Sequence, residues 1–193
     1  MSITIPLFSL NTVLFPNGVL PLRIFEPRYL DMVSDCLKND TGIGVVLIRE
    51  GAETGAAAEI FDIGTLSRIS YWHKRPDGIL SITLKGEQRF RVLSHSIKKN
   101  QLIMAEVELL PASPVTDIPV GYEHMVLLLQ KIISQLEPPY TTMPTKYECA
   151  DWVSARLIEL LPLALTDKQD LLNMDDVLER FSKLEDLLRK IDA

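Results

Sequence analysis

The spacing of apolar residues changes once along this 193-residue chain, and that change limits the folds open to it. Up to about residue 110 apolar residues mostly alternate with polar ones, which is the period of β-strands. From residue 120 onward they recur every three or four positions, as on one face of a helix. Between the two lies 111–119 (PASPVTDIP), whose three prolines interrupt regular structure. The pattern predicts an α+β protein with a β unit (1–110), a connector (111–119) and a helical unit (120–193).

In the β unit, short strand patterns follow one another with turn signals between them, which favours a closed or nearly closed barrel. Pro6 and Pro21 cannot donate to a strand neighbour, so their strands are expected at a sheet edge or at a bulge. The run 43–48 is apolar on both faces, as in a strand covered on both sides. The turn residues 76–78 predict a hairpin between 68–75 and 79–85, and two further strands are expected at about 88–97 and 102–109.

One helix is expected inside the β unit, starting at Pro27 and stopping at 39–42. The helical unit carries three longer apolar stripes, within 122–136, 150–161 and 177–191. Thr166 and Gln169 have the spacing of a capping box, which predicts that a short helix begins there.

Composition and motifs exclude several classes of protein. With 47% hydrophobic and 24% charged residues the chain is not intrinsically disordered. Its two cysteines, Cys36 and Cys149, cannot form a disulfide framework, which favours a reduced, cytoplasmic compartment. No signal-peptide n-region or membrane-length apolar run is present, so no membrane association is expected.

Sequence motifs for catalysis are equally sparse. The chain has no phosphate-binding loop, no G-x-S-x-G and no pair of histidines at metal-ligand spacing. We therefore expect no cofactor, no metal and no enzymatic activity. A nucleophilic cysteine paired in space with a histidine stays open, although Cys36 on an apolar helix stripe reads as a buried structural thiol. An enzyme of unknown reaction, with its site in a cleft between barrel and helices, also stays open as a third interpretation.

Charge is distributed unevenly over this acidic chain of net charge −6. The segment 68–99 holds eight basic and two acidic residues, a net of +6, together with Tyr71, Trp72 and Phe90. Such a segment is usually a solvated strand face, but basic and aromatic side chains together are also typical of RNA-binding barrels. The overall acidity makes nucleic acid an improbable partner. The alternative function is thus an RNA-binding protein that uses Arg68, Lys74, Arg75, Arg89 and Arg91.

The segment from Pro6 to Tyr29, PLFSLNTVLFPNGVLPLRIFEPRY, resembles the opening of the Lon protease N-terminal domain, also called the Lon substrate-binding domain. The blocks 59–69 and 84–93 and the helical tail agree with it, so the resemblance covers nearly the whole chain. It implies a PUA-like, six-stranded pseudo-β-barrel followed by a helical bundle. The ATPase and peptidase modules of Lon proteases are missing up to Ala193, so a stand-alone substrate-binding domain is expected.

The resemblance implies a non-catalytic module that binds unfolded or extended polypeptide, with a separate protease or chaperone as a further candidate partner. Binding could use strand addition at the edge indicated by Pro6 and Pro21, or an apolar groove. Phe15 is expected to be exposed beside a tight turn. Structural roles are expected for Glu26 as a helix cap, for Arg28 in an ion pair, and for Gly64 and Gly86 as bends. The candidate peptide-binding residues are Phe15, Leu20, Phe25, Tyr29, Tyr140 and Met143.

Overall fold

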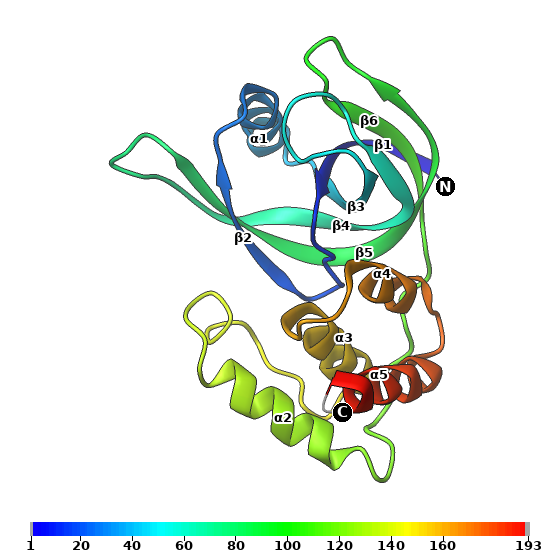
Figure 1. Cartoon of the computed structure of the whole chain (residues 1–193). Coiled ribbons are helices and arrows are strands. Elements are labelled where there is room, and N and C mark those ends of the chain that lie inside the picture. Colours follow the sequence, from blue (N-terminus) through cyan, green and yellow to red (C-terminus); the bar gives the residue numbers. More distant parts are fainter. Residues whose placement is uncertain (1, 192–193) are drawn as a thin grey trace. The chain divides into compact units, whose positions relative to one another are not determined.

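A computed structural model describes residues 2–191, which form six strands and five helices in two compact units (Figure 1). One unit extends to Pro111 and contains all six strands and α1; the other begins at Ala112 and contains α2 to α5. The strands are β1 (Ser2–Leu10), β2 (Val19–Ile24), β3 (Ile43–Glu50), β4 (Glu59–Lys74), β5 (Leu80–Ile97) and β6 (Ile103–Leu109).

The sheet closes on itself through β5. The strand order is β2-β5-β4-β3-β1-β6, and β5 also pairs with β6. The first part of β5 pairs with β2 (Val19↔Lys85 to Ile24↔Leu80), and its second part pairs with β6 (Phe90↔Leu109 to Ile97↔Ile103). Five strands therefore form a ring, and β2 is attached to it by one edge. Among the described residues, the other edge of β2 has no strand partner.

The two strand prolines differ in their surroundings. Pro21 lies in β2, at the sheet edge where a residue without an N–H is tolerated, as predicted. Pro6 lies in β1, which has two neighbours, so the expectation of an edge strand is wrong for β1 as a whole. The parallel pairing of β1 with β3 starts only at Leu7, however, so Pro6 itself pairs on one side only, with β6.

Two apolar clusters lie on opposite faces of the strands at the centre of the β unit. In β1, Leu7 belongs to one cluster and the next residue, Phe8, to the other; in β3, Val46 and Val45 are divided in the same way. The helix α1 (Pro27–Asn39) covers one of these clusters with Tyr29 and other apolar residues. This explains why the run 43–48 is apolar at every position: all six residues are buried.

The strands β4 and β5 are longer than the sequence pattern predicts, with 16 and 18 residues. The stretches 79–85 and 88–97, expected as two strands, form one strand with a register shift between Gly86 and Gln88. The segment that contains Phe15 approaches β5 closely at this shift. A Cβ at Gly86 would collide with the carbonyl oxygen of Phe15, so the position requires glycine. Beyond the ring, β4 and β5 continue as a hairpin that projects from the unit (Figure 1).

The helical unit contains α2 (Glu123–Ile133), α3 (Ala150–Leu160), α4 (Leu165–Asn173) and α5 (Val177–Ile191). The predicted capping box at Thr166 is wrong: α4 starts at Leu165, with Ala164 as N-cap residue and no side-chain cap. Two arginines are buried inside this unit beside carboxylates. Arg156 Nε lies 2.6 Å from Glu159, and Arg180 donates to Asp151 at 3.0 Å. Buried arginines need such partners because an unpaired buried charge is costly.

Candidate functional site

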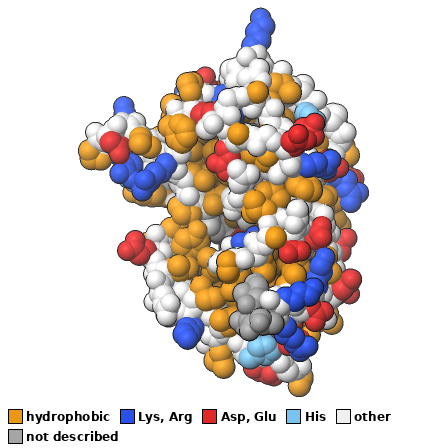
Figure 2. All heavy atoms as spheres, viewed as in Figure 1, with side chains coloured by type: hydrophobic (Ala, Val, Ile, Leu, Met, Phe, Trp, Pro, Cys, Tyr) orange, Lys and Arg blue, Asp and Glu red, His pale blue; other side chains and the backbone are white. Residues whose placement is uncertain are grey.

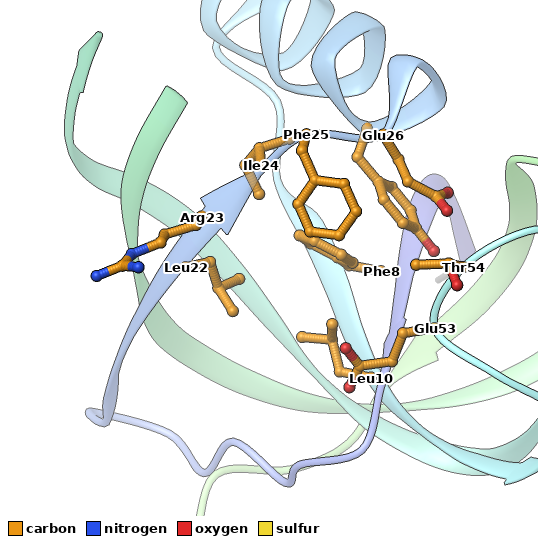
Figure 3. A pocket seen from close by; sticks show the side chains of 10 residues that line it. Phe8, Leu10, Leu22, Arg23, Ile24, Phe25, Glu26, Glu53 and Thr54 are labelled. Atoms are coloured by element: carbon orange, nitrogen blue, oxygen red, sulfur yellow. The ribbon is translucent and has the colours of Figure 1, made fainter. Parts of the chain in front are cut away.

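A pocket opens in the β unit between β1 and the unpaired edge of β2 (Figure 3). Its volume is about 70 Å³, far below the ~300–1,000 Å³ of pockets that enclose a drug-sized ligand. A single side chain of a partner is therefore a better match in size than a cofactor. The pocket is lined by Phe8, Leu10, Leu22, Arg23, Ile24, Phe25, Glu26, Tyr29, Glu53 and Thr54.

Aromatic rings line this pocket. Phe8 and Tyr29 pack with ring centroids 4.2 Å apart, and the Tyr29 hydroxyl lies 3.3 Å from Ser9 Oγ. Burial raises the pKa of Tyr29, so this phenol stays neutral at physiological pH. Phe25 points into the pocket (Figure 3), yet 65% of its surface is exposed. An aromatic side chain left open to solvent over an apolar floor is a typical contact residue at protein interfaces.

The corner between β2 and α1 is held by Arg28, which is 4% exposed. Its Nε lies 2.7 Å from Glu26, its other guanidinium nitrogens donate to the backbone carbonyls of Gln101 and Glu53 at 2.9 Å, and it stacks on Tyr29 at 4.6 Å. The predicted ion pair of Arg28 is confirmed. Glu26 is the N-cap residue of α1, as predicted, but its side chain makes no cap hydrogen bond, because its carboxylate binds Arg28 and the backbone N–H of Gly55 instead.

These contacts of Arg28 and Glu26, called the Arg28 clamp below, also fix the loop 51–58, which supplies one wall of the pocket. Besides Arg28 and Glu26, the backbone N–H of Asn11 donates to Glu53 Oε1 at 2.6 Å. Ala57 N–H donates to the side chain of Gln101 at 3.2 Å. Three separate segments therefore hold this loop, and the wall formed by Glu53 and Thr54 is built before any partner arrives.

The predicted exposure of Phe15 is wrong. Only 1% of its surface is accessible, and Phe15 does not line the pocket. The residues after it form a tight turn in which Gly18 N–H donates to the Phe15 carbonyl and Asn17 has a φ of 63°. This turn docks on β5, where Asn17 N–H donates to Gly86 and Gly86 N–H donates to Gly18. Docking turns the ring of Phe15 into the core.

The remaining predicted peptide-binding residues do not join the pocket. Leu20 is half-buried and packs on the apolar cluster under α1. Tyr140 and Met143 belong to the helical unit, in the loop between α2 and α3. Met143 is buried; Tyr140 is half-buried, and burial raises the pKa of its phenol, with the Glu159 charge acting in the same direction. Of the six candidates, the structure brings together only Phe25 and Tyr29.

Sequence reasoning missed most of the pocket. Phe8 and Leu10 read as ordinary members of an alternating strand, although their face of β1 is the one toward the pocket. Leu22 alternates with Pro21 and Arg23 on the predicted edge strand. Among these missed residues, its position on that strand is the only sequence feature that indicates a binding role. Glu53 lies in a loop without periodicity, and its position depends on contacts with distant residues.

The basic segment 68–99 does not form one cationic surface. Arg89 is buried, with 5% of its surface exposed. Arg68 pairs with Asp40 at 3.0 Å and Glu87 at 3.1 Å, and Arg75 pairs with Asp77 at 3.1 Å. Lys74 and Arg91 are exposed. Basic and apolar side chains do meet at the tip of the β4–β5 hairpin (Figure 2), but most of the predicted phosphate-binding charge is neutralised or buried.

Within residues 2–191, no group of three histidine, cysteine or carboxylate side chains is placed to hold a metal ion. Cys36 is a free, buried thiol, as predicted, and burial raises its pKa, which disfavours the reactive thiolate. In the same part of the chain, no helix is both long and apolar enough to span a bilayer.

Comparison with known proteins shows the family of the chain. The model of the ATP-dependent protease La (LON) substrate-binding domain matches residues 4–190. The chain belongs to the Lon substrate-binding domain family. Curated Lon proteases from Buchnera aphidicola and Escherichia coli K12 are each 26% identical over 94% of the chain. The chain spans about a quarter of the length of these relatives, 24% in both cases.

Solved structures agree with this Lon-type assignment. The Lon N-terminal domain protein from Xanthomonas campestris has a TM-score of 0.77 and 31% identity, over 94% of this chain and 96% of that chain. The N-terminal domain of Lon protease from the Mycobacterium avium complex has a TM-score of 0.63 at 16% identity, over 95% and 97% of the two chains, and shows a shared fold. The resemblance of 6–29 to the Lon N-terminal domain is thus confirmed, and the similarity covers a substrate-binding domain, not catalytic modules.

Proposed function

We propose that this Lon-type substrate-binding domain is a non-catalytic module that captures unfolded or extended polypeptide segments through the pocket between β1 and β2. The observation that carries the proposal is the exposed ring of Phe25 above a preformed apolar pocket beside an open strand edge. A pocket the size of one side chain suits a partner recognised by single apolar residues, as unfolded chains present them.

The wider assignment rests on the family and on the sequence. We infer that the β unit is a PUA-like barrel, because five of its strands close into a ring, and that the four helices from α2 on form a bundle. A cytoplasmic protease or chaperone that receives the bound polypeptide is the expected partner. The RNA-binding alternative is not retained, since Arg89 is buried and Arg68 and Arg75 are paired with carboxylates.

The first test measures binding of a permanently unfolded protein, reduced and carboxymethylated α-lactalbumin carrying a fluorescent label, by fluorescence anisotropy at low and high salt. Apolar capture predicts saturable binding that survives high salt, whereas phosphate-type binding would fall steeply. Phe25→Ser should weaken binding about tenfold, which corresponds to ~1.4 kcal/mol.

The matched control is Leu93→Ser, since Leu93 is another exposed apolar residue of the β unit, on β5 and outside the pocket. This variant should bind like the unaltered protein. Both variants should keep their melting temperature, because both side chains are more than half exposed. Equal binding by all three proteins would refute the pocket, and absence of any binding would refute the function.

A further inference from the structure

We propose that β2 binds the captured segment by strand addition at its open edge, and that the segment it selects combines an apolar side chain, placed in the Phe25 pocket, with a neighbouring lysine or arginine facing Glu53. This inference deepens the proposed function and rests on it. It specifies the backbone geometry of binding and the charge of the preferred segment.

The direction of the backbone groups of β2 follows from its register with β5. Gly86 N–H donates to the carbonyl of Gly18 at 2.9 Å, and Val19 lies opposite Lys85. In an antiparallel pair, residues alternate between those whose N–H and C=O both face the neighbour and those whose groups both face away. Even-numbered residues of β2 therefore face β5, and Val19, Pro21 and Arg23 direct their backbone groups to the open edge.

The position of Pro21 agrees with this assignment. A proline facing β5 would remove a ladder hydrogen bond, whereas a proline facing the open edge costs nothing within the sheet. Its missing N–H also limits what the open edge offers to a partner. Near the pocket, the available groups are the carbonyl of Pro21 and both the N–H and the carbonyl of Arg23. Pairing is thus confined to a few residues, which suits transient capture rather than stable strand exchange.

The open edge lies directly at the pocket. Leu22, Ile24 and Phe25 line the pocket from the β2 side, and Phe8 and Leu10 line it from β1 (Figure 3). A segment laid along Arg23 would place every second side chain on one face, and a side chain on the pocket side would meet Phe25. Strand edge and pocket therefore bind the backbone and the side chain of the same segment, as in other cases of β-augmentation.

Charge decides which segment fits. The carboxylate of Glu53 points toward the pocket in Figure 3, whereas Arg23 points away from it. Glu26 is already neutralised by Arg28. Glu53 Oε1 accepts from the N–H of Asn11, and among the described residues Glu53 forms no ion pair. Glu53 is therefore a carboxylate at the pocket that forms no ion pair among the described residues, so a lysine or arginine of the segment beside it would balance its charge and an acidic residue would oppose it.

The experiment uses the full chain and a fluorescein-labelled octapeptide of alternating threonine and leucine with lysine at both ends, followed by anisotropy. Peptides N-methylated at alternate positions lose backbone donors on one edge only. If the peptide adds as a strand, methylation of the alternate residues whose N–H groups face β2 should lower affinity about tenfold, because two hydrogen bonds of ~0.5–1.5 kcal/mol are lost. Methylation of the residues whose N–H groups face away from β2 should leave affinity unchanged.

Variants of the protein provide the complementary test. Arg23→Pro removes the outward N–H without removing a bond to β5, and it should lower affinity by about fivefold. Arg23→Ala is the reference variant, because it loses the same side chain but keeps the N–H, and the fivefold loss is expected for Arg23→Pro relative to Arg23→Ala. Circular dichroism verifies that the proline variant is folded; if it is not, the N-methylated peptides decide alone.

The charge preference is tested with a peptide that carries glutamate in place of both lysines. We expect it to bind about threefold more weakly than the lysine peptide, as for a partly exposed charge pair. Glu53→Gln should abolish that difference, and because glutamine keeps an acceptor for Asn11, the loop should remain in place. Equal binding of both peptides to the unaltered protein would overturn the assigned charge preference.

The outcomes separate this inference from the function on which it rests. If Phe25→Ser weakens binding but neither N-methylation nor Arg23→Pro does, strand addition is wrong and side-chain capture stands. If no peptide and no unfolded protein binds, the function itself is wrong. Concentration-dependent dimers in sedimentation that Arg23→Pro abolishes and the peptide does not displace would show that a second copy occupies the edge, which also overturns the proposal.

Discussion

Two regions of the 6–29 segment present an aromatic residue next to a proline-containing corner, and the fold uses them in opposite ways. Phe15 precedes the turn 16–18 and is 1% exposed, whereas Phe25 precedes the start of α1 and is 65% exposed. The difference comes from what each corner binds. The first turn docks its backbone on Gly86. The second directs its polar groups to the loop 51–58 and leaves its ring over the pocket.

The comparison teaches that a shared motif can hold both the framework of a site and the site itself. The turn at 16–18 determines where β2 starts, since it is joined to Gly86 immediately before β2 pairs with β5. The corner at 25–29 determines where β2 ends and which wall faces the pocket. Substitution of Phe15 at the first corner should therefore reduce stability, and substitution of Phe25 at the second should act mainly on the pocket.

The largest expected effect is that of Phe15→Ala. Removing this fully buried ring should destabilise the β unit by about 3–5 kcal/mol, the usual cost of a Phe→Ala substitution in a core. Urea unfolding followed by circular dichroism measures the loss, with Phe25→Ala as the matched control that should change stability by less than ~0.5 kcal/mol. Equal losses in both variants would remove the distinction between the two corners.

Local patterns in the sequence predict those parts of the fold that depend on local spacing. The strand and helix periods indicate β2, β3, α1 and the helices of the second unit, because burial of one face requires residues at regular intervals. The burial of Cys36 and the ion pair of Arg28 follow from such local arguments as well.

Long-range contacts explain what the sequence alone did not reveal. Phe15 is buried because Gly86, far along the chain, accepts the turn that follows it. Glu53 enters the pocket because Arg28 and Asn11 hold its loop. Neither contact leaves a periodic signal, so an exposed turn and an unremarkable loop were the natural predictions. The two predicted residues that line the pocket, Phe25 and Tyr29, lie at the end of a strand and at the start of a helix, both of which the local pattern predicts.

A second test of the comparison removes the contacts of Arg28 in the Arg28 clamp, at the corner 25–29. Arg28→Met keeps much of the buried volume but removes the ion pair with Glu26 and the bonds to the carbonyls of Glu53 and Gln101. We expect a loss of roughly 2–3 kcal/mol, because several buried polar groups lose a charged partner.

Hydrogen exchange by mass spectrometry checks where that loss occurs. Amide protection should fall in the loop 51–58 and around Gln101, whereas the turn at 16–18 should exchange as before. Peptide binding should weaken in parallel, since one pocket wall is no longer fixed. A uniform loss of protection over the whole β unit would mean that Arg28 supports the global fold rather than the pocket.

The third prediction concerns the first corner again, through its partner. In Gly86→Ala, the added methyl group would collide with the carbonyl oxygen of Phe15. Relief requires the turn to move away from β5, at an expected cost of about 1–3 kcal/mol. The thermal midpoint measures this cost. The matched control is Ser81→Ala, on the same strand and half-buried, which is expected to cost much less. Gly78→Ala would not serve, because Gly78 has a φ of 84° that strains any other residue.

The smallest effect is expected from Tyr29→Phe, and it depends on pH. Burial raises the pKa of Tyr29 above its ordinary value of 10.0. Below that value the phenol is neutral in both the folded and the unfolded state, and the variant should be less stable by up to ~1 kcal/mol, because the contact with Ser9 is lost.

Above pH ~10 the Tyr29 phenol of the unfolded chain ionises first, so the unaltered protein loses stability as pH rises through the folded-state pKa. Phenylalanine has no proton to lose, so the deficit of the variant should shrink or reverse as the pH rises above ~10 in urea titrations. A deficit that stays constant over this range would mean that the phenol is as open to water as Phe25.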